Sequence, residues 1–399
     1  MIKNKIVSLA LLTSTTSLMA MYAEQASLYK DPRIMGMGGV NVAVGSYSTS
    51  VFSNPAGLTN IKKEHGYVVD LLNLGMNSSA DINDLYNDVD KIGDMEDGEE
   101  KDQANIDLAK KYSGEHFHTG VDKYFSVSKN SDAFAWSVGL LGAFDHNLML
   151  HANNSDLAEI TSRAYGAVVF GVAKPYSTEI GRLDVGMSFK YMQGQSYEGA
   201  IGISELTDDS GDTTAFEKMQ DRYENTYSGI GVDIGVTYKP IVSVYGTDLN
   251  PAFGFSILNI GSMDLDGEYG HQPLTVNLGT SISPKVKYIN ELVIAADYVD
   301  LFNANKLRIY NFKEEVDYTD YETSDFMKHL NLGVSANLVD NRWVSTTLMT
   351  GLYQGSYTAG IDLELLIFKL NFATYEEQVG DATTEIADRR YMAKIGIGW

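Results

Sequence analysis

The stretch RLDVGMSFKYMQGQS, residues 182–196, decides the fold, because its residues alternate between two chemical classes. The apolar set is Leu183, Val185, Met187, Phe189 and Tyr191, and the set between them is Asp184, Gly186, Ser188 and Lys190. Successive side chains of a β-strand point to opposite faces of the sheet. The stretch therefore predicts a strand with one apolar face and one polar face.

The same alternation recurs along the chain and predicts about fourteen strands. They lie near residues 66–76, 116–128, 133–146, 158–174, 182–196, 226–239, 250–262, 273–284, 291–303, 327–338, 343–354, 356–365, 367–376 and 390–399. Several exceed the roughly 5–6 residues of a usual globular strand. They approach the roughly 9–11 residues of a tilted membrane strand.

Two architectures use such strands, a secreted sandwich and a transmembrane barrel. The polar faces carry Gly, Ser, Asn, Asp and Lys, which suit a watery lumen. A closed barrel also removes the unpaired edges that long apolar strands would otherwise expose. Aromatic residues at apolar strand ends indicate interfacial girdles: Tyr124, Phe125, Tyr191, Tyr238, Tyr298 and Tyr353. We therefore predict an all-β, transmembrane antiparallel barrel of about 14 strands.

The N-terminus has the pattern of a secretory signal peptide. Lys3 and Lys5 precede the short apolar run 6–12, and cleavage is expected after Ala20 or Ala23. The run is too short and too polar to span about 30 Å of hydrocarbon. Residues 1–23 are thus predicted to direct the chain to the outer membrane of a Gram-negative-type bacterium, where lipid surrounds the barrel.

The last ten residues, RYMAKIGIGW, place apolar residues on one face of a final strand. These are Tyr391, Ala393, Ile395, Ile397 and Trp399, the last residue of the chain. Such an ending resembles the signal by which the outer-membrane assembly machinery recognises its clients. The alternative is an ordinary strand that happens to end in tryptophan.

Composition excludes several classes of function. The formal charge of −23 disfavours nucleic acid as a partner. Without cysteine there is no disulfide, zinc–thiolate site or cysteine nucleophile. No local sequence brings together a nucleophile, a base and an orienting group, so we expect neither an enzyme nor a cofactor. His116 and His118 share one strand face, which suits a metal pair, a girdle or a lumen feature.

The glycine-rich stretch DPRIMGMGGVNVAVGSYSTSVFSNPAGL, residues 31–58, carries the candidate site. A dinucleotide loop is excluded because Asn41 stands where the third glycine of its pattern belongs. The local alternative is a glycine turn, a short strand over 40–44 and a turn at Asn54 and Pro55. These readings leave the purpose of so many glycines open.

The parts GMGGVNVAV and TSVFSNPAGL resemble the N-terminal signature of the long-chain fatty-acid transporter (FadL) superfamily of outer-membrane barrels. DPRIMGMGG, with the acidic DINDLYNDVDKIGD at 81–94, most resembles the TraF-like branch, which takes its name from conjugal plasmid transfer operons. The resemblance implies a fourteen-stranded barrel over 63–399. Residues 24–62 would form a hatch inside its lumen, and a kink in a wall strand would open sideways.

The resemblance also implies the residues of the hatch. Asn54, Pro55 and Ala56 match its Asn-Pro-Ala element, and Gly36, Gly38 and Gly39 would let the backbone pass close to the wall. The implied function is passive transport of hydrophobic small molecules. The alternative is a structural or secretion- and conjugation-associated barrel, a membrane platform for protein partners.

The acidic loop at 77–115 is expected to be partly helical. Ile82, Leu85, Val89 and Ile92 recur at helical spacing, which predicts an amphipathic helix lying over one end of the barrel. A calcium-binding loop that begins at Asp88 is a poor match, because Ile92 at its fifth position offers no side-chain oxygen. We therefore expect no metal and a solvated acidic face.

Overall fold

The fold is known from a computed structural model. It describes residues 20–22, 24, 26–151, 157–202, 224–244, 247–263, 271–311, 315–320, 326–379 and 386–399. The expected signal peptide lies outside the described residues, except for strand β1 (Ala20–Tyr22). The candidate cleavage residue Ala23 is also outside them.

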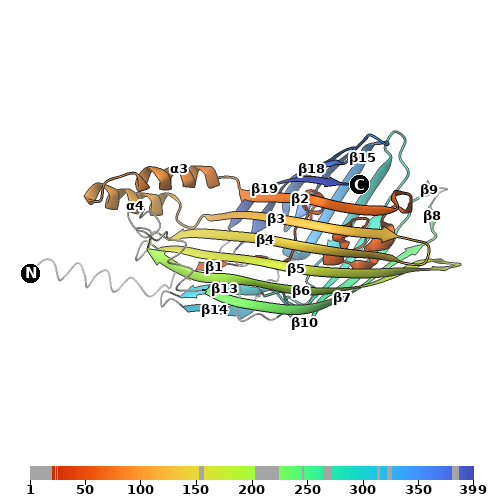
Figure 1. The fold of residues 1–399 in the computed structure, drawn as a ribbon, viewed down its shortest axis with the longest axis horizontal. Helices are drawn as coiled ribbons and strands as arrows, with labels where there is room; N and C mark the ends of the chain where they lie inside the picture. Colours follow the sequence, from red (N-terminus) through yellow and green to blue (C-terminus); the bar gives the residue numbers. More distant parts are fainter. Residues whose placement is uncertain are drawn as a thin grey trace, which may run out of the picture.

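Fourteen antiparallel strands form a closed barrel (Figure 1). They are β2 (Tyr67–Ser79), β3 (His116–Asn130), β4 (Ala135–His151), β5 (Leu157–Thr178), β6 (Gly181–Gly202), β7 (Glu224–Pro240), β10 (Ala252–Ser262), β11 (Thr275–Ile282), β12 (Glu291–Tyr298), β15 (Leu330–Asp340), β16 (Val344–Tyr353), β17 (Ser356–Leu365), β18 (Phe368–Gln378) and β19 (Ala387–Gly398). Each pairs with the next, and β19 pairs with β2 to close the wall. The predicted fold and strand number are confirmed.

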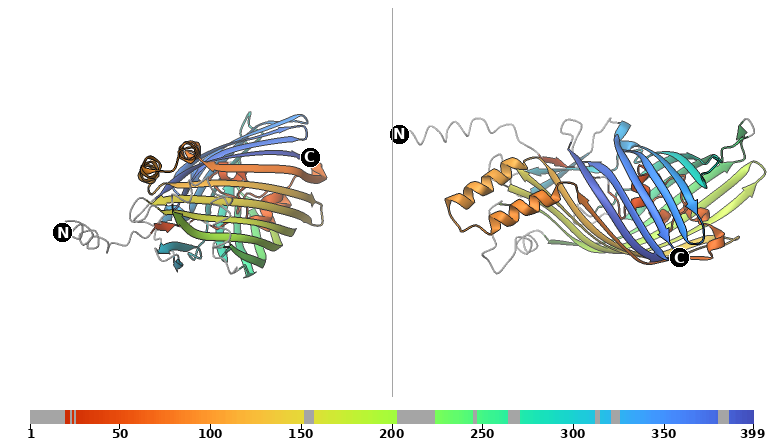
Figure 2. Two further views of the ribbon diagram at one scale, coloured as in Figure 1. Left: turned by 60° about the vertical axis from the view of Figure 1, so that its left-hand side comes forward. Right: turned by 90° about the horizontal axis from the view of Figure 1, so that it is seen from above.

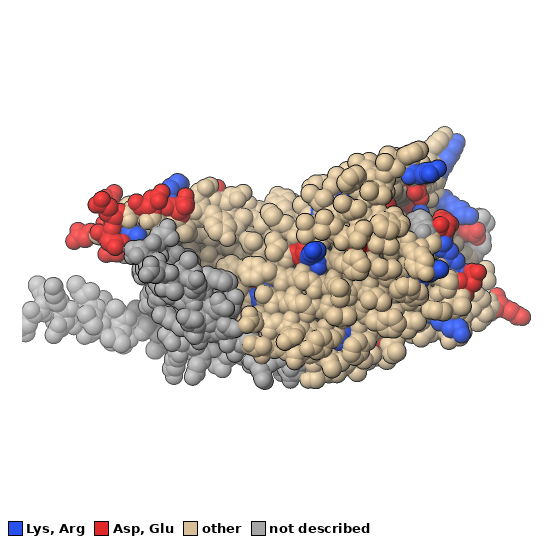
Figure 3. Space-filling model, viewed as in Figure 1, with Lys and Arg blue, Asp and Glu red and all other residues tan. Residues whose placement is uncertain are grey.

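The alternation in the sequence becomes the two faces of the wall. On β6, Met187 and Phe189 are exposed on the outside, whereas Ser188 and Lys190 are buried inside. The face seen in Figure 3 is a broad belt of mostly uncharged side chains with a few isolated charges, and most charged side chains gather at its two ends. This is the pattern of a barrel whose outer surface contacts lipid.

The two ends of the barrel differ. Short connections join β3 to β4, β5 to β6 and β17 to β18 at the end that carries the C-terminus, which we call the turn end (Figure 1). The longest connections, residues 80–115 between β2 and β3 and residues 299–329 between β12 and β15, lie at the opposite end, the loop end. The wall is uneven in height, because β5 and β6 have 22 residues each and β11 and β12 have 8 each. In outer-membrane barrels the longer loops face the cell exterior.

Two helices stand at the loop end, α3 (Ile82–Gly93) and α4 (Glu99–Lys111) (Figure 2). Their apolar residues pack with outward-facing ends of β3, β4 and β5, and the buried set is Leu85, Ile92, Leu108, Ala109, Tyr112, Phe117, Leu148, Leu150, Ala158 and Ile160. The spacing at 82–92 thus predicts α3 correctly but misses α4. No helix in the described ranges is long and apolar enough to cross a membrane.

Small elements lie outside the wall. Strands β13 (Lys306–Asn311) and β14 (Glu315–Asp320) form a hairpin with which β1 pairs, and β8 (Ser243–Val244) pairs with β9 (Thr247–Asp248). The short helix α7 (Phe326–His329) precedes β15. The alternation does not predict these elements, because they do not share the apolar face of the barrel.

Three expectations about local structure are wrong. Residues 40–44 form a turn and no strand. Tyr124 and Tyr353 are 0% and 4% exposed, so they are not part of an outer girdle. Both rings contact other aromatic rings inside the barrel. An alternating strand places aromatic residues on either face, and sequence position alone does not identify which one.

Candidate functional site in the barrel lumen

The N-terminal segment runs through the lumen from the loop end to the turn end (Figure 2). It contains helix α2 (Pro32–Gly36) and the 3₁₀ helices η1 (Ser48–Phe52), η2 (Pro55–Asn60) and η3 (Lys63–His65). We call residues 31–61 the plug and residues 24–30 the arm. The plug is almost wholly buried although it contains only short helices and turns.

The glycines of the plug lie against glycines of the wall. The Gly36 Cα lies 2.9 Å from the place where a Cβ on Gly360 would stand, and the Gly38 nitrogen lies 2.8 Å from that place on Gly351. Gly38 and Gly39 also have φ of 72° and 79°, a conformation that glycine adopts without strain. Side chains at these positions would push plug and wall apart.

The wall glycines form a belt around the plug. A Cβ on any of them would lie within 3 Å of a plug atom, and the set is Gly171, Gly186, Gly235, Gly254, Gly279, Gly333, Gly351 and Gly360. These residues come from eight of the fourteen strands. The plug therefore touches the wall backbone on many sides at this level.

Asn54 joins turns of the plug to two strands. Its Oδ1 accepts a hydrogen bond from the Ala56 nitrogen at 3.0 Å, which caps η2 at Pro55. Its Nδ2 donates to the Val42 oxygen at 2.6 Å and to the Val236 oxygen of β7 at 3.2 Å. Asn54 is 0% exposed. One amide thus satisfies backbone groups on both sides of the plug–wall boundary.

A wall carboxylate holds the other half of the plug. Asp297 of β12 accepts hydrogen bonds at its Oδ2 from the nitrogens of Asn41 and Val42, at 2.6 and 2.8 Å. At the exit of the plug, Asn130 of β3 donates to the Thr59 and Ile61 oxygens at 2.8 and 2.7 Å. Polar side chains of the wall therefore replace water for the irregular backbone in the lumen.

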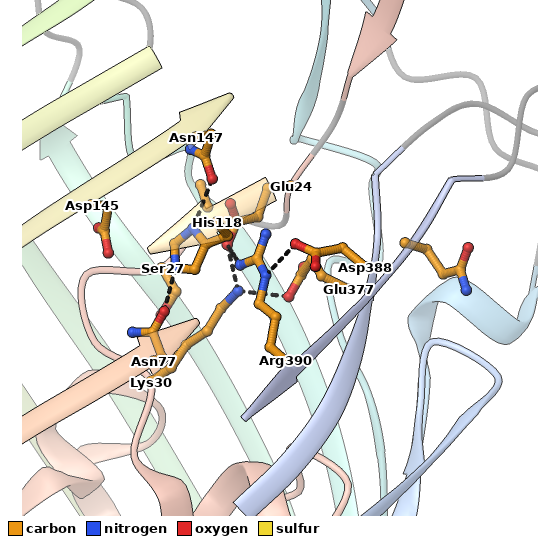
Figure 4. Close-up of polar contacts among 12 residues, drawn as sticks. Glu24, Ser27, Lys30, Asn77, His118, Asp145, Asn147, Glu377, Asp388 and Arg390 are labelled. Atoms are coloured by element: carbon orange, nitrogen blue, oxygen red, sulfur yellow. Dashed lines mark hydrogen bonds and ion pairs between the residues drawn. The ribbon is translucent and has the colours of Figure 1, made fainter. Parts of the chain in front are cut away.

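The arm is held by ion pairs at the loop end (Figure 4). The Glu24 Oε1 lies 2.8 Å from the Lys30 Nζ and 2.9 Å from Arg390 Nη1 of β19. Lys30 also pairs with Glu377 of β18 at 2.7 Å, and Arg390 with Asp388 at 2.7 Å. Charges of opposite sign thus alternate from the arm to the wall.

These partners shift the pKa values of the arm. Burial raises the pKa of the Glu24 carboxyl, but Arg390 and Lys30 outweigh it and hold that pKa well below its usual range. Burial lowers the pKa of Lys30, but Glu24 and Glu377 outweigh it and hold that pKa well above its usual range. Both groups are therefore charged at neutral pH.

The two predicted strand histidines belong to the same region of the lumen. His116 Nδ1 lies 2.9 Å from Asp388 Oδ2, and Figure 4 shows His118 between Asn77 and Asn147. Within the described ranges, no group of three or more metal-binding side chains comes together. The histidines serve as hydrogen-bonding groups of the lumen.

The candidate calcium ligand Asp88 of α3 forms ion pairs with Lys91 and Lys111, at 2.9 and 2.6 Å.

Comparison with known proteins identifies the family. The family model described as "F plasmid transfer operon, TraF, protein" matches residues 51–250, half of the chain. The chain belongs to this TraF family. No curated protein matches it.

Solved structures that are similar to the TraF-family barrel are distant in sequence. The toluene transporter TbuX of Ralstonia pickettii is 13% identical, with 92% of this chain and 97% of that chain covered and a TM-score of 0.49. The toluene transporter TodX of Pseudomonas putida is 10% identical, with 94% and 99% covered and a TM-score of 0.48. A FadL homologue of Pseudomonas aeruginosa is 8% identical, with 94% and 98% covered and a TM-score of 0.45.

The lumen of this TraF-family chain contains an apolar cluster on the loop-end side of the glycine belt. Its buried members are Leu28, Tyr29, Tyr124, Leu141, Tyr165, Ala167, Met192, Tyr227 and Met263, with Phe52 and Ala143 packed against them. We call this set the lumen cluster. The rings of Tyr29, Phe52 and Tyr124 lie 5.4–5.6 Å apart by their centroids. The sequence did not predict the cluster, because its wall residues stand singly on the polar faces of different strands.

On the turn-end side, a cavity of about 1160 Å³ opens below the plug. Tyr47, Ser48 and Asn60 of the plug line it, together with wall residues that include Arg182 and Glu291. Its lining is mixed in charge and unlike that of the lumen cluster. The plug of this TraF-family chain therefore lies between an apolar region and a polar mouth.

The wall beside the lumen cluster has two irregular points, one between β2 and β3 at Asp70 and Asn73 and the other between β10 and β7. The register of β10 against β7 shifts between Ile257 and Ile260, and Asn259 there has φ of 61°. Asn259 accepts a hydrogen bond from Lys190 Nζ at 2.6 Å and donates one to the Pro273 oxygen at 2.9 Å. A bulge of this kind is a local bend of the wall, and side-chain bonds close it.

The predicted assembly residues lie on the outside of β19. Tyr391, Ile395 and Trp399 are 56–59% exposed, and Ile397 is partly exposed on the same face. The Trp399 nitrogen and oxygen bond to the Val69 oxygen and nitrogen at 3.0 and 2.7 Å. The C-terminal strand thus forms one side of the seam that closes the barrel, with its apolar face toward lipid.

Proposed function

We propose that this chain is an outer-membrane barrel that lets hydrophobic small molecules cross passively, with the plug as its gate. The observation that carries this proposal is the lumen cluster. Lumens of membrane barrels are ordinarily polar. An interior lined by Met192, Tyr227 and Met263, with plug residues as neighbours, offers an apolar solute a site that water does not favour.

The order of regions along the axis supports the same proposal. A solute entering from the loop end meets the lumen cluster first, then the plug, and then the polar mouth. Passage requires the plug to move, since it touches the wall on many sides. Hydrogen bonds and ion pairs hold the arm and plug against the wall, and no disulfide does so because the chain has no cysteine, which permits such a movement.

The first experiment is mass spectrometry of molecules that co-purify with the full barrel after gentle extraction from its own membrane. We expect a stoichiometric hydrophobic molecule, lost when Met192 is replaced by glutamate. Met392→Glu is the matched control, because Met392 also faces the lumen but in another cluster. A barrel that carries no such molecule, or one lost equally in both variants, would contradict the proposal.

A second candidate function is a membrane platform for protein partners in conjugation or secretion. Two features favour it, the family's link to a plasmid transfer operon and the ordered helical pair at the loop end. A cross-linkable partner at the outer faces of α3 and α4, in cells whose barrel carries no lumen molecule, would favour the platform. A lumen molecule without such a partner would favour transport.

A further inference from the structure

The outer wall carries one unpaired cation in an apolar setting. Lys123 of β3 is exposed on the outward face, six residues along the strand from Lys129 at the turn end. Its outward neighbours Val121 and Leu74 are 48% and 49% exposed and apolar. Within the described part of the chain, its ammonium forms no ion pair or hydrogen bond. A lysine on a lipid-facing wall is unfavourable unless its charge is neutralised or reaches the headgroups.

Another outward cation of the wall does have a partner. Arg389 of β19 lies 3.0 Å from Glu376 and 4.0 Å from the ring centroid of Tyr357. A carboxylate of the chain therefore neutralises Arg389 near the loop end of β19. Among the residues that the structure describes, Lys123 has no such carboxylate partner, although it lies on the taller side of the same wall.

A row of opposed residues that includes two glycines runs from Lys123 across the three neighbouring strands, and we call this row the groove. The strand register places Lys123 opposite Gly142, Gly142 opposite Gly166, and Gly166 opposite Gln193. Directly opposed residues of antiparallel strands share one face. Gly142 and Gly166 are exposed on the outside, so two adjacent side chains are missing between a lysine and a glutamine.

Packing within the chain does not require these two glycines. A Cβ on Gly142 would meet nothing within 4 Å, and one on Gly166 would meet only the Leu141 oxygen at 3.7 Å. Neither residue is among those with positive φ. The glycines of the lumen belt differ, because a side chain on them would overlap the plug. The space above Gly142 and Gly166 lies outside the protein.

Apolar side chains border the groove on both sides. The row toward the turn end is Phe125, Leu140 and Val168, and the row toward the loop end is Val121, Phe144 and Ala164. Leu140 and Val168 are 50% and 45% exposed. The groove is thus a polar slot in a surface that contacts hydrocarbon, with a cation at one end and an amide at the other.

We propose that this groove binds the phosphate group of an anionic lipid in the loop-end leaflet. The lipid phosphate neutralises the Lys123 ammonium and accepts a hydrogen bond from the Gln193 amide, while its acyl chains extend toward the turn end over the row of Phe125, Leu140 and Val168. Phosphate is a common partner of lysine, and charge-assisted hydrogen bonds are the stronger ones. A lipid fits better than a soluble anion because the slot opens to the membrane.

The test is native mass spectrometry of the full barrel in neutral detergent, titrated with lipid A, a phosphorylated glycolipid. A neutral diacylglycerol glycolipid is titrated in parallel. We expect Lys123→Gln to weaken lipid A binding about tenfold, since the charge-assisted bond is lost. Lys123→Arg should retain binding, and filling the groove with Gly142→Leu and Gly166→Leu should weaken it. Lys174→Gln removes an exposed lysine near the turn end of β5 and should have no effect.

Four outcomes would overturn the proposal. They are unchanged lipid A binding in Lys123→Gln, equal binding of the neutral glycolipid by the wild type, displacement of lipid A by millimolar inorganic phosphate, and a change of oligomeric state instead of lipid binding in the groove variants. Far-ultraviolet circular dichroism establishes that each variant keeps its β-structure. If the leucine variants fail to assemble, the comparison of Lys123→Gln with Lys123→Arg decides alone.

Discussion

Asp297 Oδ2 lies 2.6 Å from the backbone nitrogen of Asn41, so a carboxylate of the wall holds the backbone of the plug. The same oxygen accepts from the nitrogen of Val42 at 2.8 Å. Asp297 is 1% exposed, and water cannot replace it there. Two adjacent amides of an irregular segment thus depend on one side chain that is 256 residues distant along the chain.

Replacing Asp297 by alanine should loosen the plug without opening the wall. Leaving a buried amide without its hydrogen-bond acceptor costs about 1–3 kcal/mol, and two adjacent amides would lose theirs. We expect faster amide hydrogen exchange at Asn41 and Val42 while strand amides stay protected. Asp132→Ala removes an exposed carboxylate that pairs with Lys63, and serves as the control. Unchanged exchange at both amides would show that Asp297 does not hold the plug.

Adding a side chain to the glycine belt should displace the plug. Gly235→Ala places a methyl group on the Asn54 amide, and Gly186→Ala places one on the backbone of Pro55 and Ala56. Because these contacts are with backbone or a fully bonded amide, the plug must shift. We expect proteases to cleave the plug in these variants while the barrel still migrates as a folded species. Gly142→Ala adds the same methyl group on the outer face and should leave the plug protected.

The sequence predicts the wall far better than the lumen. Most barrel strands have a period-two signal, because lipid outside and polar groups inside impose opposite chemistry on successive residues such as Met187 and Ser188. The stretch ELLIFKL at 364–370 breaks this alternation. The plug has no such period. Its place follows only from a family resemblance and from glycines such as Gly36, whose partner Gly360 is 324 positions away.

The residues of the arm and the lumen cluster carry even less local signal. Glu24 and Arg390 lie 366 residues apart, and nothing near either one indicates the other. Met192 is an apolar residue on the polar face at the end of an alternating strand, and its position alone does not indicate a role. Such residues become neighbours only when the barrel closes and brings different strands around the same part of the lumen.

Removing Arg390 should release the arm. Breaking a buried ion pair by deleting one partner costs about 3–5 kcal/mol, because the other charge is left uncompensated. A double-mutant cycle with Glu24→Gln and Arg390→Met isolates their coupling. We expect Glu24→Gln to loosen the arm strongly in the wild type and weakly in the Arg390→Met background, measured by proteolysis at the arm. Equal effects in both backgrounds would mean that the two residues are not coupled. Lys91→Met, which breaks an exposed pair on α3, should leave the arm unchanged.

The docking of the arm should be insensitive to pH across a wide range. The lowered pKa of Glu24 gives stability that is present above its usual pKa and lost as the pH falls through the lowered value. The raised pKa of Lys30 gives stability that is present below its usual pKa and lost as the pH rises through the raised value. From about pH 5 to about pH 10 both charges therefore persist. A spin label on Ser27→Cys, in a chain with no other cysteine, should keep one mobility over this range. A marked gain in mobility between pH 5 and 8 would contradict the assignment.

Deleting residues 36–56 should open the lumen while the barrel still assembles. The segment contains the contacts with the glycine belt and the Asn54 bonds, whereas the closing seam of β19 with β2 lies outside it. The lumen polar groups that it now satisfies, such as Asp297, would then bind water, which favours an open channel. We expect intact cells to become permeable to small polar solutes that the wild-type barrel excludes. The control is a deletion of residues 96–98 between α3 and α4, which shortens an exposed connection and should leave permeability unchanged. Normal assembly with unchanged permeability in the 36–56 deletion would show that the segment is not the barrier, and a gate in the lumen would have to be abandoned.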